Sequence, residues 1–421
     1  MAVTEASSTR RTLHTLPCVL MRAGTSKGPF IHRKYLPENE ADWAPHLIAA
    51  LGSTGCDPRQ IDGVGGGTST TSKVAVVSPS SREDMDVDFT FVQVAVGKES
   101  IDLTGNCGNF ISGVGPFAVQ EGLVKPEKGA RTVDVRVWNT NTNRGVIETV
   151  ELNEDGTYKE DGDYKIPGVN STGSEVKIAW LDPAGSMTGK LFPSGQQQQM
   201  LPIQPPSSLP QIEPFEARVT LIDSANPFIF VDAAFLAPQL QKLASPEEQH
   251  ILVEAIRQHA AVEMGLAAST EIASKTRGTP KVALTYAPLR RAGKPTSDIR
   301  IAAYSMGLPH PTLQLSGAVC VASALCCSGT ILSELSAHPV DADDAPITPD
   351  RTPSPGSETD EYKMASPQAV REERDVVIEH SKGTIDASVV VTRDSGEEHI
   401  ESCTVSRTAR RLFEGNVRYF I

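Results

Sequence analysis

Several features that define other classes of protein are missing from this 421-residue sequence. No CxxC pair occurs, and the cysteines are odd in number, which disfavours both a disulfide framework and a zinc site. No apolar run suggests a membrane span, and the first 17 residues lack the apolar core of a secretory signal. We therefore expect a cytoplasmic protein with reduced thiols, with a mitochondrial location as the weaker alternative. The seven thiols are Cys18, Cys56, Cys107, Cys320, Cys326, Cys327 and Cys403.

Positive charge is also in short supply. The chain has 39 Lys and Arg against 52 Asp and Glu, a formal net charge of -13. A general nucleic-acid binder needs a basic face to neutralise phosphates, so this class of partner is disfavoured. An anionic ligand would have to meet local cations or backbone N–H groups. The shares of hydrophobic residues (39%) and charged residues (22%) are typical of a globular protein. The chain is long enough for two ordinary domains.

Alternating apolar and polar residues predict a β-rich chain with few helices. Segments such as 87–97 have the period of a strand, and this pattern continues to about residue 180. Helices are predicted over 38–53 and over 245–265, the second with Ser245 as its N-cap. The Gln- and Pro-rich stretch 193–214 predicts an irregular surface excursion. The Pro-, Asp- and Ser-rich stretch 338–366 predicts a disordered insertion.

A weak internal repeat divides the chain. Residues 21–36 parallel 221–236, and residues 103–119 parallel 315–331, in the same order in each half. The fold class predicted is α+β, with two pseudo-symmetric domains facing each other across a cleft. Each would be a rolled β-sheet around a central apolar helix whose N-terminus reaches the cleft, where free N–H groups can bind a carboxylate. We place the domains at 1–175 plus 404–421, and at 176–403.

Cys107 stands between two Gly/Asn pairs, in "GNCGN", just ahead of the first of these apolar helices. A thiol at a helix N-terminus should have a lowered pKa and act as an acid/base. Aligning the repeats places Val319 opposite Cys107, with Cys320 one residue further and Ser316 as an option if the register slips. The second thiol of a two-cysteine site is therefore missing or displaced.

Lys73 is the candidate for the second proton relay. It lies on a predicted strand, with Val74–Val77 as its apolar part, that leaves the glycine- and hydroxyl-rich loop "GVGGGTSTTS". Partial burial beside another cation would lower its pKa toward use. The loop matches neither GxxxxGK[ST] nor GxGxxG, so nucleotide binding is disfavoured.

Five ordered motifs carry a resemblance to a known family. They are "MRAGTSKG" (21–28), "IDGVGGGTSTTSKVA" (61–75), "LTGNCGN" (103–109), "SMGLPHPTLQLSGAVC" (305–320) and "SRTARRLFEGNV" (406–417). Together they resemble the PrpF family, which includes methylitaconate and aconitate Δ-isomerases and has a diaminopimelate epimerase-like fold. The resemblance implies an active site between two domains, without metal or organic cofactor, in which Lys73 and Cys107 carry the proton transfers. This chain departs from the family at Ala23, where Gly is usual, and in the two insertions, which concern specificity and partners.

The substrates that the resemblance implies are small unsaturated di- or tricarboxylates. A base removes a proton that is both allylic and next to a carboxylate, and an acid returns a proton to the far carbon. Such a shift converts cis-aconitate to trans-aconitate, or methylitaconate to dimethylmaleate. The residues that we assign to carboxylate binding are Arg22, Ser26, Lys27, Gly66, Gly67, Thr68, Ser69, Thr70, Asn106, Gly108, Asn109, Ser305, Met306, His310, Ser316, Gly317 and Ala318.

Alternatives stay open at this point. His310, between two prolines, could equally be structural, and Arg407, Arg410 and Arg411 are expected in a salt-bridged turn. The protein could instead bind aconitate as an accessory to an aconitase-type enzyme. An amino-acid epimerase of the same fold would need two facing cysteines, so the missing thiol argues against it. The expected partner is a small polycarboxylate, and neither nucleic acid nor a membrane is expected as a partner. The oligomeric state stays open, with a homodimer as one alternative.

Overall fold

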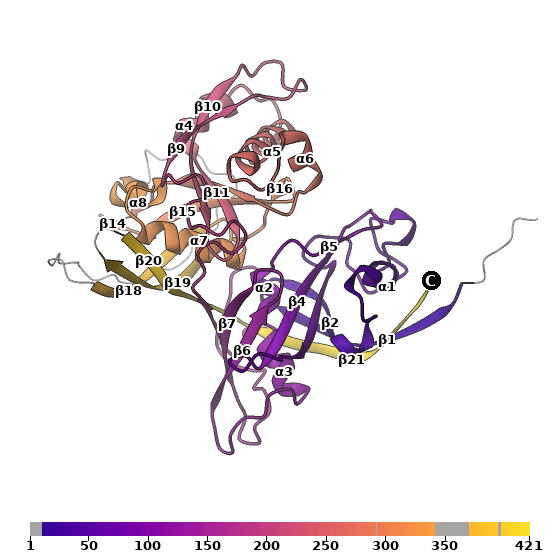
Figure 1. The fold of residues 1–421 in the computed structure, drawn as a ribbon. Coiled ribbons are helices and arrows are strands. Elements are labelled where there is room, and N and C mark those ends of the chain that lie inside the picture. Colours follow the sequence, from indigo (N-terminus) through magenta and orange to yellow (C-terminus); the bar gives the residue numbers. More distant parts are fainter. Residues whose placement is uncertain (1–10, 292, 342–369, 395–396) are drawn as a thin grey trace, which may run out of the picture.

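The computed structural model describes residues 11–291, 293–341, 370–394 and 397–421. Figure 1 shows two lobes: one formed by the indigo-to-purple first part of the chain, the other by the pink-to-orange part. The last strand, in yellow, returns to the first lobe and pairs there with β1. Of the predicted insertion 338–366, residues 342–366 lie outside the described part of the chain.

The first part of the chain supplies strands β1 to β8 and three short α-helices. The strands are β1 (Leu13–Ala23), β2 (Ser26–His32), β3 (Lys73–Pro79), β4 (Val87–Val94), β5 (Ile101–Asp102), β6 (Thr132–Asn139), β7 (Arg144–Glu151) and β8 (Val176–Leu181). The helices are α1 (Trp43–Leu51), α2 (Gly108–Ile111) and α3 (Val114–Gln120), with 3-10 turns at Arg33–Tyr35, Glu40–Asp42 and Thr54–Cys56.

The second part supplies the remaining elements. Its strands are β9 (Gln199–Ile203), β10 (Phe215–Asp223), β11 (Pro227–Asp232), β12 (Lys281–Tyr286), β13 (Leu289–Arg291), β14 (Lys294–Pro295), β15 (Ile299–Ser305), β16 (Leu308–Pro309), β17 (Val340–Asp341), β18 (Val370–His380), β19 (Gly383–Asp394), β20 (Glu397–Arg407) and β21 (Ala409–Phe420). Its helices are α4 (Ala233–Leu240), α5 (Pro246–Glu263), α6 (Thr270–Lys275), α7 (Leu315–Cys326) and α8 (Ile331–Ala337).

The strand pairing repeats itself in the two halves. In the first half the hairpin β1–β2 is followed by parallel β3, antiparallel β4, parallel β6 and antiparallel β7 and β8. In the second half the hairpin β10–β11 is followed in the same way by β12, β15, β18, β19 and β20. Even the register agrees, because Phe30 pairs with Ala75 and Phe230 with Ala283. The internal repeat that the sequence indicated is therefore present in the pairing.

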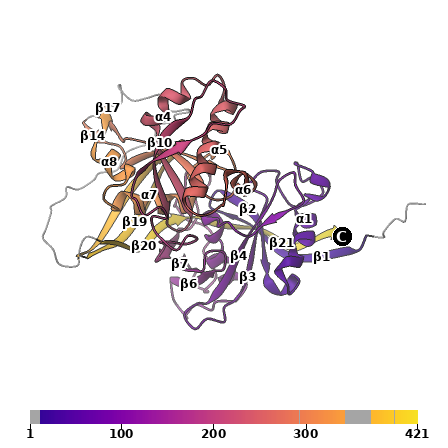
Figure 2. The ribbon, with the colours of Figure 1, turned by 45° about the horizontal axis from the view of Figure 1, so that its top comes forward.

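The two runs of strands join into one sheet. Strand β8 pairs on one side with β7 and on the other with β20, and Figure 2 shows β19 and β20 beside β6 and β7. At the outer edges of the two runs of strands, β21 pairs with β1 and β9 pairs with β10. The α+β fold class is confirmed. The domain boundaries stay a prediction, and the one placed at 403/404 falls inside β20.

Each lobe curls around helices. In the first lobe α3 packs against β3, β6 and β7, and in the second α7 packs against β10, β11, β18, β19 and β20. Every residue of α7 is buried. One apolar core joins the lobes, since it contains both Phe117 from α3 and Val321 from α7.

The first central helix differs from the prediction of one continuous element. It breaks at Ser112 and Gly113 into α2 and α3. The hydroxyl of Ser112 donates to the carbonyl of Asn109, and the N–H of Gly113 donates to the carbonyl of Phe110, so the turn tightens there. A Cβ at position 113 would lie 2.6 Å from the Phe30 ring, so only glycine fits this approach.

Two other sequence predictions have clear outcomes. The predicted helices correspond to α1 and α5, and the Ser245 hydroxyl accepts the N–H of Glu248 at 3.2 Å as an N-cap. The prediction of an irregular surface excursion over 193–214 is wrong in part, since the stretch is irregular except at Gln199–Ile203. The stretch contains β9, an edge strand beside β10. The aliphatic side chains of Leu201, Ile203 and Leu209 in this stretch are buried in the core of the second lobe.

Among the described residues, no single helix has the length and apolar character needed to cross a membrane. The pair α7 and α8 meets both criteria only when the two are taken together, and it is bent by 69° at the break.

The seam between the lobes provides a test of the fold. Ile178 on β8 is fully buried opposite Val405, whereas its neighbour Lys177 is exposed. Ile178→Ala should lower the free energy of unfolding by about 2–5 kcal/mol, because it opens a cavity in the core. The matched change Lys177→Ala should alter it by less than about 0.5 kcal/mol. Urea unfolding measures both, and equal small effects would contradict the burial of this seam.

Candidate active site

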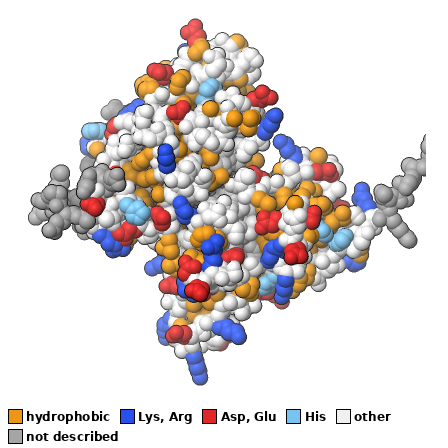
Figure 3. Space-filling view, viewed as in Figure 1, with side chains coloured by type: hydrophobic (Ala, Val, Ile, Leu, Met, Phe, Trp, Pro, Cys, Tyr) orange, Lys and Arg blue, Asp and Glu red, His pale blue; other side chains and the backbone are white. Residues whose placement is uncertain are grey.

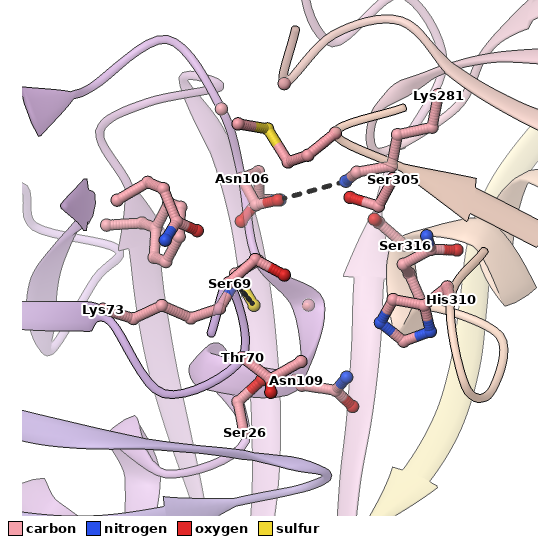
Figure 4. A pocket seen from close by; sticks show the side chains of 18 of the residues that line it. Ser26, Ser69, Thr70, Lys73, Asn106, Asn109, Lys281, Ser305, His310 and Ser316 are labelled. Carbon is pink, nitrogen blue, oxygen red and sulfur yellow. Dashed lines mark hydrogen bonds between the residues drawn. The ribbon is translucent and has the colours of Figure 1, made fainter. Parts of the chain in front are cut away.

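A pocket lies where the two lobes meet (Figure 4). The first lobe lines it with the loop before β3, the start of β3 and the turn that leads into α2. The second lobe lines it with the start of β12, the turn between β15 and β16, and the start of α7. The predicted site residues that line it are Ser26, Ser69, Thr70, Lys73, Asn106, Cys107, Gly108, Asn109, Ser305, Met306, His310 and Ser316.

Lys73 and Cys107 are in direct contact in this pocket. The Lys73 ammonium donates to the Cys107 sulfur at 3.4 Å and lies 5.0 Å from the centre of the Phe91 ring. Lys73 is the first residue of β3, and Cys107 is the N-cap residue of α2. Sequence reasoning placed both as proton carriers, and the fold brings them together from positions 34 residues apart.

The surroundings of Cys107 favour its thiolate. Burial would by itself raise the pKa of the thiol, but the Lys73 ammonium, the N–H of Phe110 and the Lys281 ammonium together outweigh burial and lower the pKa. The cation next to the sulfur, more than the short helix behind it, is the source of this shift. The pair can therefore exist as thiolate and ammonium.

Lys281 is a pocket residue that sequence reasoning missed. It is the first residue of β12, and its ammonium donates to the main-chain carbonyl of Asn106 at 3.5 Å across the lobes. Burial lowers the pKa of Lys281 to about 8, and the Lys73 cation adds to this effect, although Cys107 opposes it. The signal was present, since "TPKVALT" (279–285) parallels "TSKVAVV" (71–77).

The start of α7 settles which residue of the repeat faces Cys107. Ser316 lines the pocket. A Cβ at Gly108 would lie 2.7 Å from the Ser316 nitrogen, so "CG" at 107–108 meets "SG" at 316–317. The alignment that placed Val319 or Cys320 opposite Cys107 is wrong. Cys320 is fully buried, and its thiol donates to the carbonyls of Ser224 and Asn226 at 2.7 and 3.0 Å.

His310 is neutral in the pocket wall. Burial lowers its pKa to about 4, the nearby Lys73 and Lys281 cations add to this, and the contact with Thr312 opposes it. Its Nδ1 lies 2.6 Å from the Thr312 carbonyl. A neutral imidazole that is held in this way can present its other nitrogen to a ligand without adding charge.

Some predicted binding residues do not line the pocket. The Arg22 guanidinium donates to the carbonyl and hydroxyl of Thr408 at 2.8 and 3.0 Å, which leaves it tied to the end of the β1 hairpin. Gly317 packs against Phe228, and the N–H of Ala318 donates to the carbonyl of Gln314, the N-cap residue of α7. Gly67 and Thr68 hold the shape of the loop that presents Ser69 and Thr70. Outside the pocket are thus Arg22, Lys27, Gly66, Gly67, Thr68, Gly317 and Ala318.

Arg407 reaches the site through a neighbour. It is buried, and its Nε donates to the Asn109 side-chain carbonyl at 3.2 Å, which fixes the direction of a pocket amide. Burial lowers the pKa of Arg407 to about 10. The predicted turn is wrong, because Arg410 and Arg411 lie in β21 and pair with β1, but Arg411 does form an ion pair, with Glu121 at 2.8 Å. The salt bridge was thus correctly expected for Arg411, whereas Arg407 makes none within the described residues and instead holds Asn109.

The pocket concentrates positive charge in an acidic protein. The face seen in Figure 3 carries both signs interspersed, while Lys73 and Lys281 share one small interior space. Within the described ranges, no group of three or more His, Cys, Asp or Glu residues is arranged to hold a metal ion. What the arrangement offers is a thiol, two amines, hydroxyls and amides, which suits proton exchange on an anionic ligand.

Comparison with known proteins identifies the family of the chain. The family described as PrpF protein matches residues 13–342. YraM of Bacillus subtilis is 40% identical over 321 residues, which cover 74% of this chain and 84% of that protein. The 2-methyl-aconitate isomerase of Shewanella oneidensis is 31% identical over 420 residues, covering 94% of this chain and 95% of that protein. The (4E)-oxalomesaconate Delta-isomerase of Novosphingobium sp. is 33% identical over 411 residues, covering 97% of this chain and 98% of that protein.

Solved structures agree with these relatives. The crystal structure of a methylitaconate-delta-isomerase matches with a TM-score of 0.68 and 30% identity, covering 97% of this chain and 96% of that one. A hydroxyproline epimerase from Agrobacterium vitis matches with a TM-score of 0.51 and 11% identity, covering 97% and 94%, which concerns the fold alone. The fold is therefore of the epimerase-like class. The chain belongs to the PrpF family.

The electrostatic coupling of the pair can be measured through thiol reactivity. Cys56 is the exposed cysteine among the described residues, so Cys56→Ser leaves Cys107 as the accessible thiol. Lys73→Met in this background should move the pH profile of iodoacetamide alkylation upward by about one pH unit or more, because the neighbouring cation is lost. The control Lys27→Met, which removes a lysine outside the pocket, should leave the profile in place. Coincident profiles for all three proteins would contradict the coupling.

Proposed function

We propose that this protein is an isomerase that moves a carbon–carbon double bond in a small unsaturated di- or tricarboxylate, by a 1,3-allylic proton transfer without a cofactor. The observation that carries the proposal is the contact between the Lys73 ammonium and the Cys107 sulfur, in a pocket that holds a second lysine. A thiolate is a base and an ammonium is an acid, so the two halves of a proton shift stand side by side.

The general class rests on family membership. The Shewanella and Novosphingobium relatives are named isomerases, and so is the structure with a TM-score of 0.68. The acids in these names differ, but each name refers to an unsaturated acid. An isomerase of aconitate-like acids is thus the reading that the relatives support.

The proton transfers can be written as a closed cycle. The Cys107 thiolate takes a proton from the carbon that is allylic and next to a carboxylate: the C–H bond breaks and an S–H bond forms. The electron pair spreads over the dienolate, which Lys281 and the pocket hydroxyls stabilise. The Lys73 ammonium then gives a proton to the far carbon, and the double bond has moved. The resulting thiol and amine exchange a proton across their 3.4 Å contact and restore the starting pair.

For the substrate we propose cis-aconitate, with trans-aconitate as the product. Methylitaconate is the alternative, since the same groups would remove and return its protons. A second candidate function is that of an accessory protein that binds aconitate for an aconitase-type enzyme. An amino-acid epimerase is disfavoured, because the residue of the repeat that meets Cys107 is Ser316, and a hydroxyl is a far weaker acid than a thiol.

The reaction is tested by following olefinic proton signals in deuterated water. Wild-type protein with cis-aconitate should show loss of substrate signals, appearance of the isomer and deuterium at the carbon that receives the proton. Methylitaconate is assayed in parallel to decide between the two acids. If neither acid turns over but an unreactive tricarboxylate still raises the melting temperature, the accessory function would replace the isomerase.

Cys107→Ala should lower turnover by about 10²–10⁴-fold, the usual contribution of a general base, with the melting temperature little changed. Turnover of cis-aconitate and thermal unfolding are measured on the same sample. Near-normal turnover would reassign the thiol to packing.

Lys73→Arg should fail almost as badly as Lys73→Ala, since a guanidinium does not give up its proton at working pH. Binding of an unreactive tricarboxylate should partly survive in Lys73→Arg, because the positive charge is kept, and thermal protection measures it. If Lys73→Arg kept most of its turnover, the lysine would be a charge clamp and another group would have to donate the proton.

A further inference from the structure

The strand β21 presents a long unpaired edge of the sheet. It runs antiparallel beside β1, as Figure 1 shows in yellow, and within the described residues β1 is the one strand that pairs with it. β21 has twelve residues and no proline, whereas β9, at the other outer edge, has five residues and contains Pro202. Short strands and prolines protect an edge, and a long edge without them is a template for pairing with another chain.

The main-chain groups of β21 point alternately to β1 and to the free edge. Thr12 and Ile421 exchange two N–H···O bonds, at 2.7 and 3.1 Å, which fixes the phase of this alternation. Counting back from Ile421 in steps of two, the odd-numbered residues as far as Gly415 bond to β1 in the same way. The N–H and C=O groups of the even-numbered residues from 414 to 420 therefore point to the free edge, where a second strand can bond to them.

The side chains of these even-numbered residues are available as well. Glu414, Asn416, Arg418 and Phe420 are all exposed, whereas Val417 is buried in the cluster that α1 forms with β1 and β21. Glu414 contacts Arg411 of its own strand, and Arg418 forms no ion pair within the described ranges. One strand edge thus carries an acid and a base four residues apart, with an amide midway between them.

Exposed apolar side chains gather at the same edge. Leu13, Leu412, Phe413, Phe420 and Ile421 are each 41–55% exposed, and they are five of the thirteen large hydrophobic residues exposed in the described part of the chain. Single exposed hydrophobic residues are normal on a protein surface, but a group of them on one strand pair marks an interaction surface.

A second copy of the chain matches this edge when its β21 runs antiparallel about a two-fold axis at Asn416. The outward-pointing main-chain groups of both copies then face each other. Glu414 of each copy lies opposite Arg418 of the other, and Leu412 lies opposite Phe420. Opposite charges and apolar side chains that face each other across a strand pair are both stabilising. A register centred on Glu414 or on Arg418 would instead place two like charges opposite each other.

We propose that β21 is a dimerisation strand, through which two copies of this chain join their sheets in the register centred on Asn416. Because each copy uses the same edge, the assembly closes at two chains. No residue of this edge lines the pocket between the lobes, so each copy keeps a complete site. The inference is therefore independent of the proposed function.

Charge reversal tests the register. Analytical ultracentrifugation of wild type at micromolar concentration should give twice the mass of one chain. Glu414→Arg and Arg418→Glu should each raise the dissociation constant of the dimer by about 10- to 100-fold, because each replaces two attractive pairs by two repulsive ones. The control Lys128→Glu reverses the charge of an exposed lysine of the first lobe, away from β21, and should change the constant less than about twofold.

Mixing the two variants separates this pairing from a general loss of structure. In a mixed dimer of Glu414→Arg with Arg418→Glu, every cross-strand pair again joins opposite charges. An equimolar mixture should therefore dimerise about as well as wild type, although each variant alone does not.

A backbone variant tests the edge without changing its charge. Asn416→Pro removes an outward N–H group and leaves the bonds to β1 in place, so it should give a monomer with an unchanged circular dichroism spectrum. The matched change Asn416→Ala keeps the N–H group and should leave the dimer in place.

Three results would overturn the proposal. One is a wild-type protein that stays monomeric at micromolar concentration. Another is a dimer whose dissociation constant is the same in Glu414→Arg and in Asn416→Pro as in wild type. The third is a mixture of the two charge variants that stays monomeric, because the register centred on Asn416 would then be wrong.

Discussion

The close approach of Gly108 to Ser316 is the contact on which the site depends. A Cβ at position 108 would lie 2.7 Å from the Ser316 nitrogen, so the starts of α2 and α7 can meet only because glycine stands there. This approach brings Cys107 from one lobe to the wall built by the other. It also places Lys281 of β12 within reach of the Asn106 carbonyl. The single sheet that joins the lobes through β8 and β20 holds the two sides in register around that contact.

The electrostatics of the pocket follow from this arrangement. The protein has a net charge of -13, yet two lysines share an interior space in which His310 is neutral. One lysine compensates the Cys107 thiolate, and the other has no acidic partner among the described residues. A site of this kind favours a small anion over a neutral molecule, and it keeps a base and an acid in contact. In the proposed reaction Lys73 takes part in proton transfer and Lys281 stabilises the anion, so the two lysines of the repeat would have different roles.

Much of this was visible in the sequence, for reasons that can be named. The period of the strands, the Ser245 N-cap and the order of the repeated motifs are local signals, and they predicted the α+β fold, α5 and the pairing of Lys73 with Cys107. The register at α7 was not local: Val319 and Ser316 were both compatible with the pattern, and only the packing of Gly108 decides between them. Arg22 looked like a carboxylate ligand because of its charge, but its hydrogen bonds to Thr408, 386 residues away, could not be read from the motif. Lys281 could not be recognised from the hairpins and central helices of the repeat, because its signal lies in the strand between them, where "TPKVALT" parallels "TSKVAVV".

The most direct test of the central claim is a crystal structure of the protein with tricarballylate bound. We expect a ligand that spans the lobes, with one carboxylate within about 3 Å of the Lys281 ammonium and the Ser316 hydroxyl. Its carbon chain should lie within about 3.5 Å of the Cys107 sulfur. A ligand that contacts only one lobe, or that leaves Lys281 without a carboxylate while it occupies the pocket, would contradict the claim that the two halves of the repeat share one substrate.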